Sequence, residues 1–149
     1  MPLIDNIFNS IRLKNYKNSK KYFMKKIIFT EKAPAPIGPY NQAVLKGNIL
    51  YTSGQIAIHP KTGELVTANI EEETHQVMHN IKAVLEAAGM TFENVVKTTI
   101  FIMNMSDFGC INTVYGSYFN EKTAPARETV QVACLPKNVN VEISMIAIL

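Results

Sequence analysis

Near its C-terminus the sequence alternates polar and apolar residues with a period of two, and few folds accommodate that pattern. The apolar residues of the last segment are Val141, Ile143 and Met145, and the polar ones are Asn140, Glu142 and Ser144. Successive side chains of a β-strand point to opposite faces, so this segment predicts a strand with one apolar and one polar face. Residues 127–134 repeat the alternation, with Arg127 on the polar face. Two such strands predict a sheet that is covered on its apolar face, while its polar face meets water, a ligand or another subunit.

An amphipathic helix is predicted over residues 71–88. Its apolar residues recur at the i, i+3, i+4 spacing of one helix face, and they are Val77, Met78, Ile81, Val84, Leu85 and Ala88. Three glutamates at its start suit the positive end of the helix dipole, and Gly89 is typical of a residue that ends a helix. A second, shorter helix is expected with Ser106 as its cap and with Phe108 and Tyr115 in its apolar stripe.

The remaining regular segments are predicted to be strands. A hairpin is expected within residues 41–53, and the β-branched run 94–103 is typical of a buried strand. Residues 33–40 contain several Pro and Gly residues and predict a stiff loop that holds Tyr40. Residues 53–55 interrupt a strand, which indicates a bulge or a close approach of the backbone to a ligand. The order of these elements predicts an α+β fold with both helices on the apolar face of the sheet.

Charge is distributed unevenly along the 149 residues. Residues 1–26 contain seven basic residues and one acidic residue (net +6), whereas residues 27–149 contain eight basic and eleven acidic residues (net −3). Domains that bind nucleic acid ordinarily present a basic face. We therefore divide the chain into a basic extension, residues 1–26, and a domain, residues 27–149, whose charge disfavours a nucleic-acid partner.

The basic extension has two interpretations. Its apolar residues Ile4, Ile7, Phe8 and Ile11 recur at helical spacing among lysines, as in presequences that direct a protein to an organelle such as a mitochondrion or plastid. The alternative is a disordered, lysine-rich extension of a cytoplasmic protein, with Met24 as a second start.

Metal and membrane partners are not predicted. His75 and His79 lie at i, i+4 in the long helix, but no third ligand is evident, so we expect no metal. Cys110 and Cys134 do not form a Cys-x-x-Cys motif, which fits a reducing compartment. No apolar run approaches the ~20 residues of a membrane-spanning helix.

Arg127 and Glu142 are the first candidates for a functional role. Apart from Arg12, Arg127 is the only arginine of the chain, and it follows shortly after Pro125. A guanidinium matches a carboxylate with two parallel hydrogen bonds, so Arg127 predicts a small carboxylate-bearing ligand. The alternative is a structural ion pair between Arg127 and a carboxylate of the chain, such as Glu142.

Five blocks occur in order within residues 24–149: Ile-Gly-Pro-Tyr-Asn-Gln-Ala-Val at 37–44, Ser-Gly-Gln-Ile at 53–56, Asn-Val-Val-Lys-Thr-Thr at 94–99, Pro-Ala-Arg at 125–127 and Val-Glu-Ile at 141–143. Together they resemble the reactive intermediate deaminase (Rid) family, also called the YjgF or endoribonuclease L-PSP family. The resemblance implies a chorismate-mutase-like α+β fold and a homotrimer whose sheets form a central barrel, with active sites between subunits. It also implies hydrolysis of 2-imino or enamine acids, such as 2-iminopropanoate and 2-iminobutanoate, to 2-keto acids and ammonia without a cofactor.

The resemblance also implies which residues form the site. Arg127 matches the arginine that clamps the substrate carboxylate, and Glu142 matches the glutamate that positions the attacking water. Tyr40 is expected to line the site as a third catalytic residue. The other substrate-binding residues that the resemblance implies are Ser53, Gly54, Asn112 and Thr129.

Three residues depart from the family pattern. Thr129 stands where some members have a cysteine, and Ala124 replaces a bulkier residue, which predicts a wider cleft. Glu128 replaces a small or apolar residue, and by strand parity it is expected to point away from Arg127, toward the apolar side of the sheet.

The chemistry that the family resemblance implies agrees with the types of the candidate site residues. An imine carbon is already electrophilic, so orienting a carboxylate, placing a water and assisting proton transfer are sufficient. Two other function classes remain open: an endoribonuclease or translation inhibitor, and a non-catalytic trimer that binds a small molecule in the same pocket. The net charge of −3 weighs against the first.

Overall fold

A computed structural model describes residues 24–149; residues 1–23, on which the targeting prediction mainly rests, lie outside the described residues. The strands are β1 (Lys25–Ile28), β2 (Ala43–Lys46), β3 (Ile49–Thr52), β4 (Val95–Ile102), β5 (Ala126–Gln131) and β6 (Val141–Ile148). The α-helices are α2 (Ile70–Ala87) and α3 (Phe108–Gly116), and the 3-10 helices are η1 (Phe92–Asn94), η2 (Met105–Asp107) and η3 (Pro136–Asn138).

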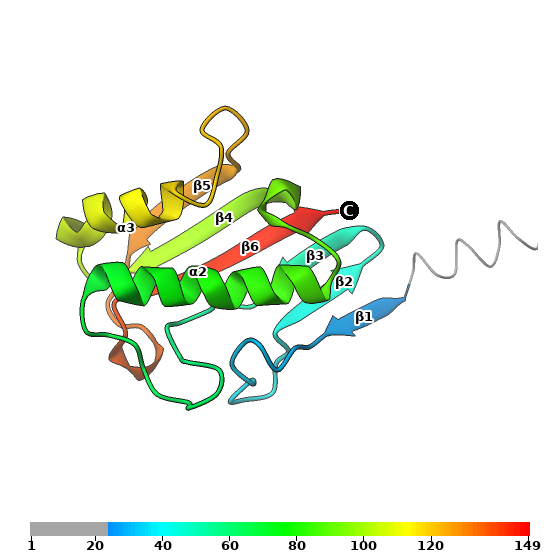
Figure 1. Cartoon of the computed structure of the whole chain (residues 1–149), viewed down its shortest axis with the longest axis horizontal. Helices are drawn as coiled ribbons and strands as arrows, with labels where there is room; N and C mark the ends of the chain where they lie inside the picture. The colour runs from blue at the N-terminus through cyan, green and yellow to red at the C-terminus, as the bar shows by residue number, and fades with distance from the viewer. Residues whose placement is uncertain (1–23) are drawn as a thin grey trace, which may run out of the picture.

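The six strands form one mixed sheet in the order β1-β2-β3-β6-β4-β5. All neighbours pair antiparallel except β4 and β5, which run parallel because α3 lies between them in the chain. Both helices lie on the same face of the sheet (Figure 1), so the predicted α+β arrangement is confirmed. The strand β5 forms one edge of the sheet and β1 the other.

The core lies between α2 and the central strands. Its largest fully buried side chains include Met78, Ile81 and Leu85 of α2 and Ile143 and Met145 of β6. Each such side chain contributes about 1.5–3 kcal/mol relative to an exposed one. The helix agrees with its prediction to within one residue at each end. Asn69 caps its start by accepting a hydrogen bond from the Glu72 amide at 2.8 Å, and Gly89 follows its end with a φ of 77°.

The predicted cap of the second helix is wrong. Ser106 lies inside η2, where its amide donates to the Asn104 side chain at 3.0 Å, and α3 begins at Phe108 without a side-chain cap. Asn104, two residues before Ser106, accepts the Ser106 amide with its side chain and caps the 3-10 helix η2, so Ser106 lies within a turn and not at a helix start. Tyr115 of the expected stripe is buried, as is Ile111 of the same helix.

Arg127 and Glu142 occupy opposite faces of the sheet, which corrects the expectation of a shared polar face. Arg127 pairs in register with Thr98, and the Thr98 side chain accepts a hydrogen bond from Tyr115 of α3. Arg127 therefore lies on the helix-covered face. Glu142 pairs with Phe101, three residues from Thr98 and hence on the uncovered face. The alternation shows which residues of one strand share a face, but it cannot show which face the helices cover.

Glu128 also lies on the uncovered face, so its predicted position on the apolar side is wrong. It points away from Arg127 as expected, pairs in register with Thr99, and forms an ion pair with Lys97 and a hydrogen bond with Thr99. Lys97 and Thr99 of the neighbouring strand β4 lie on this face, and their contacts with Glu128 account for its position there.

Candidate active site

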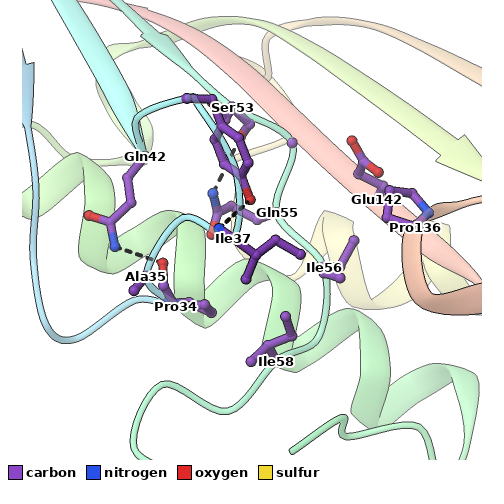
Figure 2. A pocket seen from close by; sticks show the side chains of 12 residues that line it. Pro34, Ala35, Ile37, Gln42, Ser53, Gln55, Ile56, Ile58, Pro136 and Glu142 are labelled. Atoms are coloured by element: carbon purple, nitrogen blue, oxygen red, sulfur yellow. Dashed lines mark hydrogen bonds between the residues drawn. The ribbon is translucent and has the colours of Figure 1, made fainter. Parts of the chain in front are cut away.

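The predicted site residues divide between two cavities in separate parts of the fold. The Glu142 cavity has a volume of about 440 Å³ and lies between the proline-rich loop, the segment after β3 and the start of β6. The Arg127 cavity has a volume of about 540 Å³ and lies between α3, the loop after it and β5. Figure 2 shows the first of these with Glu142 at one side and Ile37, Ile56 and Ile58 in its wall.

Glu142 is a half-buried carboxylate that forms no hydrogen bond or ion pair with any residue in the described range 24–149. Its side chain lies against Gly54, where a Cβ would come within 1.9 Å of Oε1. Burial raises the pKa of the Glu142 carboxyl above its ordinary value. A carboxyl group that holds its proton more tightly, in a cavity with mainly apolar walls, is suited to general acid and base chemistry.

The strand that carries Glu142 is anchored on both sides of this residue. Glu73 of α2 is fully buried, and its carboxylate accepts the Asn140 amide at 2.7 Å and the Asn140 side-chain amide at 2.8 Å. On the other side, Gln55 and Ile143 exchange two backbone hydrogen bonds of 2.8 and 3.1 Å. Hydrogen bonds to a charged acceptor are among the stronger ones, so these contacts fix the backbone from which Glu142 projects.

Gln42 holds the proline-rich loop that forms one wall of the Glu142 cavity. Its side-chain nitrogen donates to the carbonyl of Ala33 at 3.1 Å and to that of Pro34 at 2.8 Å. At the end of the loop, the Tyr40 hydroxyl accepts the Ile37 amide at 3.3 Å. The phenol ring therefore lines the cavity in a defined position, as the stiff loop predicted.

The opposite wall is held by Asn80 of α2. This buried side chain donates to the carbonyls of Ile56 and Ile58 at 3.0 and 2.9 Å. Ser53 donates its hydroxyl to the Asn41 carbonyl at 2.6 Å, which ties the end of β3 to the loop. Because buried polar groups that are fully paired resist displacement, the cavity is formed before any ligand enters.

Arg127 is oriented by α3. Its Nη1 donates to Asn112 Oδ1 at 2.8 Å, and its guanidinium carbon lies 4.9 Å from the centre of the Tyr115 ring and 5.7 Å from that of Phe108. The ion pairs within the described part of the chain are Lys82–Glu86 and Lys97–Glu128. The structural ion pair that the sequence left open is therefore not formed within residues 24–149, and Arg127 keeps donors for a ligand.

The remaining predicted residues fall on these two cavities with one exception. Tyr40, Ser53 and Gly54 line the Glu142 cavity, and Asn112 lines the Arg127 cavity. Thr129 lines neither. Its hydroxyl is buried and is the one such side-chain atom in the described range that lacks a hydrogen-bond partner.

Sequence reasoning missed the apolar wall of the Glu142 cavity and the aromatic rings beneath Arg127. The wall residues Ile37, Ile56 and Ile58 lie in loops, where no periodicity marks them. Phe108 and Tyr115 did carry a signal. They stand four residues before and three after Asn112, on one face of α3, so the predicted apolar stripe of this helix also faces Arg127.

Within the described residues, no group of three or more His, Cys, Asp or Glu side chains is arranged to hold a metal ion. None of the helices there has the length and apolar character that would let it cross a membrane.

Comparison with known proteins assigns the chain to a family. Residues 30–149 match the family model described as endoribonuclease L-PSP. The chain belongs to this L-PSP family, also called the Rid family. A RutC family protein of Pyrococcus horikoshii is 53% identical over 124 residues, which cover 83% of this chain and 98% of the relative. The Escherichia coli protein named 2-iminobutanoate/2-iminopropanoate deaminase is 49% identical over 127 residues, covering 84% and 98%.

Solved structures of L-PSP family members share the fold. A protein of the Rid family from Yersinia pestis superposes with a TM-score of 0.82 at 50% identity, covering 85% of this chain and all of the other. Escherichia coli TdcF, solved with bound serine, superposes with a TM-score of 0.79 at 44% identity, covering 83% and 98%. The recognition of the family from its five sequence blocks is thus confirmed.

Proposed function

We propose that this chain is a hydrolase that converts 2-imino acids, such as 2-iminopropanoate and 2-iminobutanoate, to 2-keto acids and ammonia. The observation that carries the proposal is the state of Glu142. It is a half-buried carboxylate without a partner in the described range, its pKa is raised by burial, and it faces a preformed cavity. The names of the Escherichia coli relatives support the same chemistry.

The complete site, in this proposal, lies between copies of the chain. Arg127 and Glu142 face opposite sides of the sheet, so the two residues of one chain do not serve one ligand. The uncovered sheet face carries exposed apolar side chains, including Tyr51 at 47%, Val130 at 44% and Ile148 at 38% exposure. Such a face favours burial against further copies. We propose a closed homotrimer, of about 50 kDa by sedimentation.

The reaction needs a bound carboxylate, one water and two proton transfers. Arg127 of one copy would bind the substrate carboxylate through its free N–H groups. Glu142 of the neighbouring copy would take a proton from water as the oxygen adds to the imine carbon, forming a tetrahedral carbinolamine. The same carboxyl group would return that proton to the nitrogen. The carboxylate would then take the second proton from the carbinolamine hydroxyl and deliver it to the nitrogen as the carbon–nitrogen bond breaks, which releases ammonia, forms the carbonyl of the 2-keto acid and returns Glu142 to its starting state.

The side chain of the substrate would contact the apolar wall of the Glu142 cavity. Ile37, Ile56 and Ile58 offer no partner for a charge. Short apolar side chains, as in the imines derived from alanine and 2-aminobutanoate, fit this lining, and each buried methylene group would add about 0.8 kcal/mol.

The test is hydrolysis of imines released in situ. An amino-acid oxidase acting on alanine, with catalase present, supplies 2-iminopropanoate, and semicarbazide competes for the imine. Purified protein should lower the yield of semicarbazone and speed the appearance of pyruvate. The Arg127→Ala variant should lose this effect while keeping its fold, because losing a charge-assisted bidentate contact costs several kcal/mol of transition-state binding.

Two controls separate the other function classes. Single-stranded RNA incubated with the protein should remain intact, and cleavage that the Arg127→Ala variant also shows would indicate an activity outside this site. Folded protein that binds pyruvate but leaves the semicarbazone yield unchanged would overturn the catalytic proposal in favour of a binding protein.

A further inference from the structure

The Arg127 guanidinium is held against aromatic rings of α3. Its carbon lies 4.9 Å from the centre of the Tyr115 ring, within the range of a cation–π contact, and 5.7 Å from that of Phe108. Its one hydrogen bond within residues 24–149, to Asn112, uses a single N–H group. A single hydrogen bond allows the guanidinium plane to rotate, whereas an aromatic ring stacked beneath the guanidinium restricts this rotation.

Tyr115 is itself held rigidly. Its side chain is 4% exposed, its hydroxyl donates to Thr98 Oγ1 at 3.0 Å, and its ring packs on Phe119 at a centroid distance of 4.7 Å. Burial raises the pKa of the Tyr115 phenol, with the Thr98 hydrogen bond and the Arg127 charge acting in the opposite direction. The phenol is therefore neutral at physiological pH, and Arg127 meets the face of a neutral ring.

We propose that Tyr115 is a positioning residue that sets the plane of the Arg127 guanidinium, so that its free N–H groups face a ligand carboxylate. The chain of contacts runs from the buried Thr98 of β4 through the Tyr115 hydroxyl and ring to Arg127 on the edge strand β5. This inference rests on the proposed function, because it assumes that Arg127 is the carboxylate clamp.

The test measures binding of pyruvate, the stable keto-acid product, to the purified full chain by NMR titration. Tyr115→Leu should weaken pyruvate binding roughly 5- to 30-fold, the range that corresponds to a partly desolvated cation–π contact. Tyr115→Phe retains the ring and loses only the hydroxyl, so its affinity should stay within about threefold of wild type. Tyr115→Met, which fills more of the same space, replaces the leucine variant if that one fails to fold.

A matched control is available three residues further along the chain. Tyr118 is also an aromatic residue beside α3, but it contacts His75 and Phe92 and lines neither cavity. Tyr118→Leu removes a comparable ring and should leave pyruvate affinity unchanged. In turnover of 2-iminopropanoate, Tyr115→Leu should raise KM more than it lowers kcat, because the Glu142 cavity is untouched.

The outcomes are distinguishable. Unchanged pyruvate affinity in folded Tyr115→Leu, or an equal loss in Tyr118→Leu, would overturn the positioning role. If Arg127→Ala binds pyruvate as tightly as wild type does, the carboxylate clamp and the proposed function fail instead. If Arg127→Ala and Tyr115→Leu lose affinity while Tyr115→Phe and Tyr118→Leu keep it, the inference is supported.

Discussion

Gly54 and Glu142 are in such close contact that any side chain at position 54 would displace the Glu142 carboxyl group. A Cβ there would lie 1.9 Å from Oε1, 2.7 Å from Cδ and 2.9 Å from Cγ of Glu142. The φ angle of Gly54 is not in the left-handed region, which among the glycines of the described residues is occupied by Gly47, Gly63 and Gly89. The absence of a side chain at residue 54 therefore serves to make room for the Glu142 carboxyl group.

We predict that Gly54→Ala displaces Glu142 and slows imine hydrolysis roughly 10- to 100-fold, since misplacing a reacting group by about 1 Å has effects of that size. The clash involves a side chain that can change rotamer, so the fold should survive. Gly109→Ala is the control, because a Cβ at Gly109 of α3 meets nothing within 4 Å. Steady-state kinetics with melting curves would decide, and wild-type kcat in Gly54→Ala would contradict the contact's role.

The candidate residues could be predicted from sequence, but their division between two separate cavities could not. Residue types, spacing and the family resemblance predicted Arg127, Glu142 and Tyr40 as candidates, and the period of two showed correctly that Arg127 and Glu128 point to opposite sides. The pattern could not show that β5 lies at an edge, parallel to β4 and beneath the aromatic residues of α3. That placement depends on long-range packing, which puts Arg127 on the covered face.

Thr129 illustrates a second limit. Strand parity places it on the same face as Arg127, yet the structure leaves its hydroxyl buried, unpaired and outside both cavities. Whether a side chain on the correct face reaches a cavity depends on its neighbours in space. The sequence of a single strand does not contain that information.

Glu142→Gln is predicted to lower activity and raise stability together. The amide cannot accept the proton from water, so the chemical step should slow by roughly 10²-fold or more. Burial raises the folded-state pKa of Glu142 above its ordinary value of 4.5. As pH rises past 4.5, the unfolded chain therefore loses its proton first, and wild type becomes less stable relative to the variant.

Melting curves at several pH values test this relation. The Tm of Glu142→Gln should exceed that of wild type at pH 8, and the difference should disappear below pH 4.5. The effect should be small, because the side chain is only half buried. A lower Tm for the variant with an unchanged single-turnover rate would show that Glu142 has a structural role.

His79 is predicted to make the fold sensitive to acid. Burial, followed by the charges of His75 and Lys82, lowers the folded-state pKa of His79 below its ordinary value of 6.5. Above pH 6.5 this shift does not affect the free energy of unfolding. As pH falls from 6.5 toward the lowered pKa, the unfolded chain binds a proton at His79 before the folded protein does, so the free energy of unfolding decreases and then levels off. His79→Gln should therefore lose less stability than wild type between pH 8 and pH 5. Equal pH dependence of urea unfolding in the two proteins would contradict this assignment.

The separation of Arg127 from Glu142 leads to a complementation experiment. Arg127→Ala and Glu142→Gln should each be nearly inactive alone. If each site takes Arg127 from one copy and Glu142 from its neighbour, trimers that contain both variants will include sites in which both residues are wild type. Random assembly from equal amounts would restore about one quarter of the sites. A site built within one chain could not be restored, because every chain carries one defect.

Co-expression of the two variants with different affinity tags, followed by purification through both tags, would isolate the mixed assemblies. Homotrimers of either variant are removed by this purification, so one site in three should be wild type and imine hydrolysis should approach about a third of the wild-type level. The matched control pairs Glu142→Gln with the double variant Arg127→Ala/Glu142→Gln, which also forms mixed assemblies but lacks a wild-type Glu142 in every site. Activity in the first mixture and none in the second requires a site shared between copies, whereas inactivity of both would refute the shared site and leave Arg127 and Glu142 with separate roles.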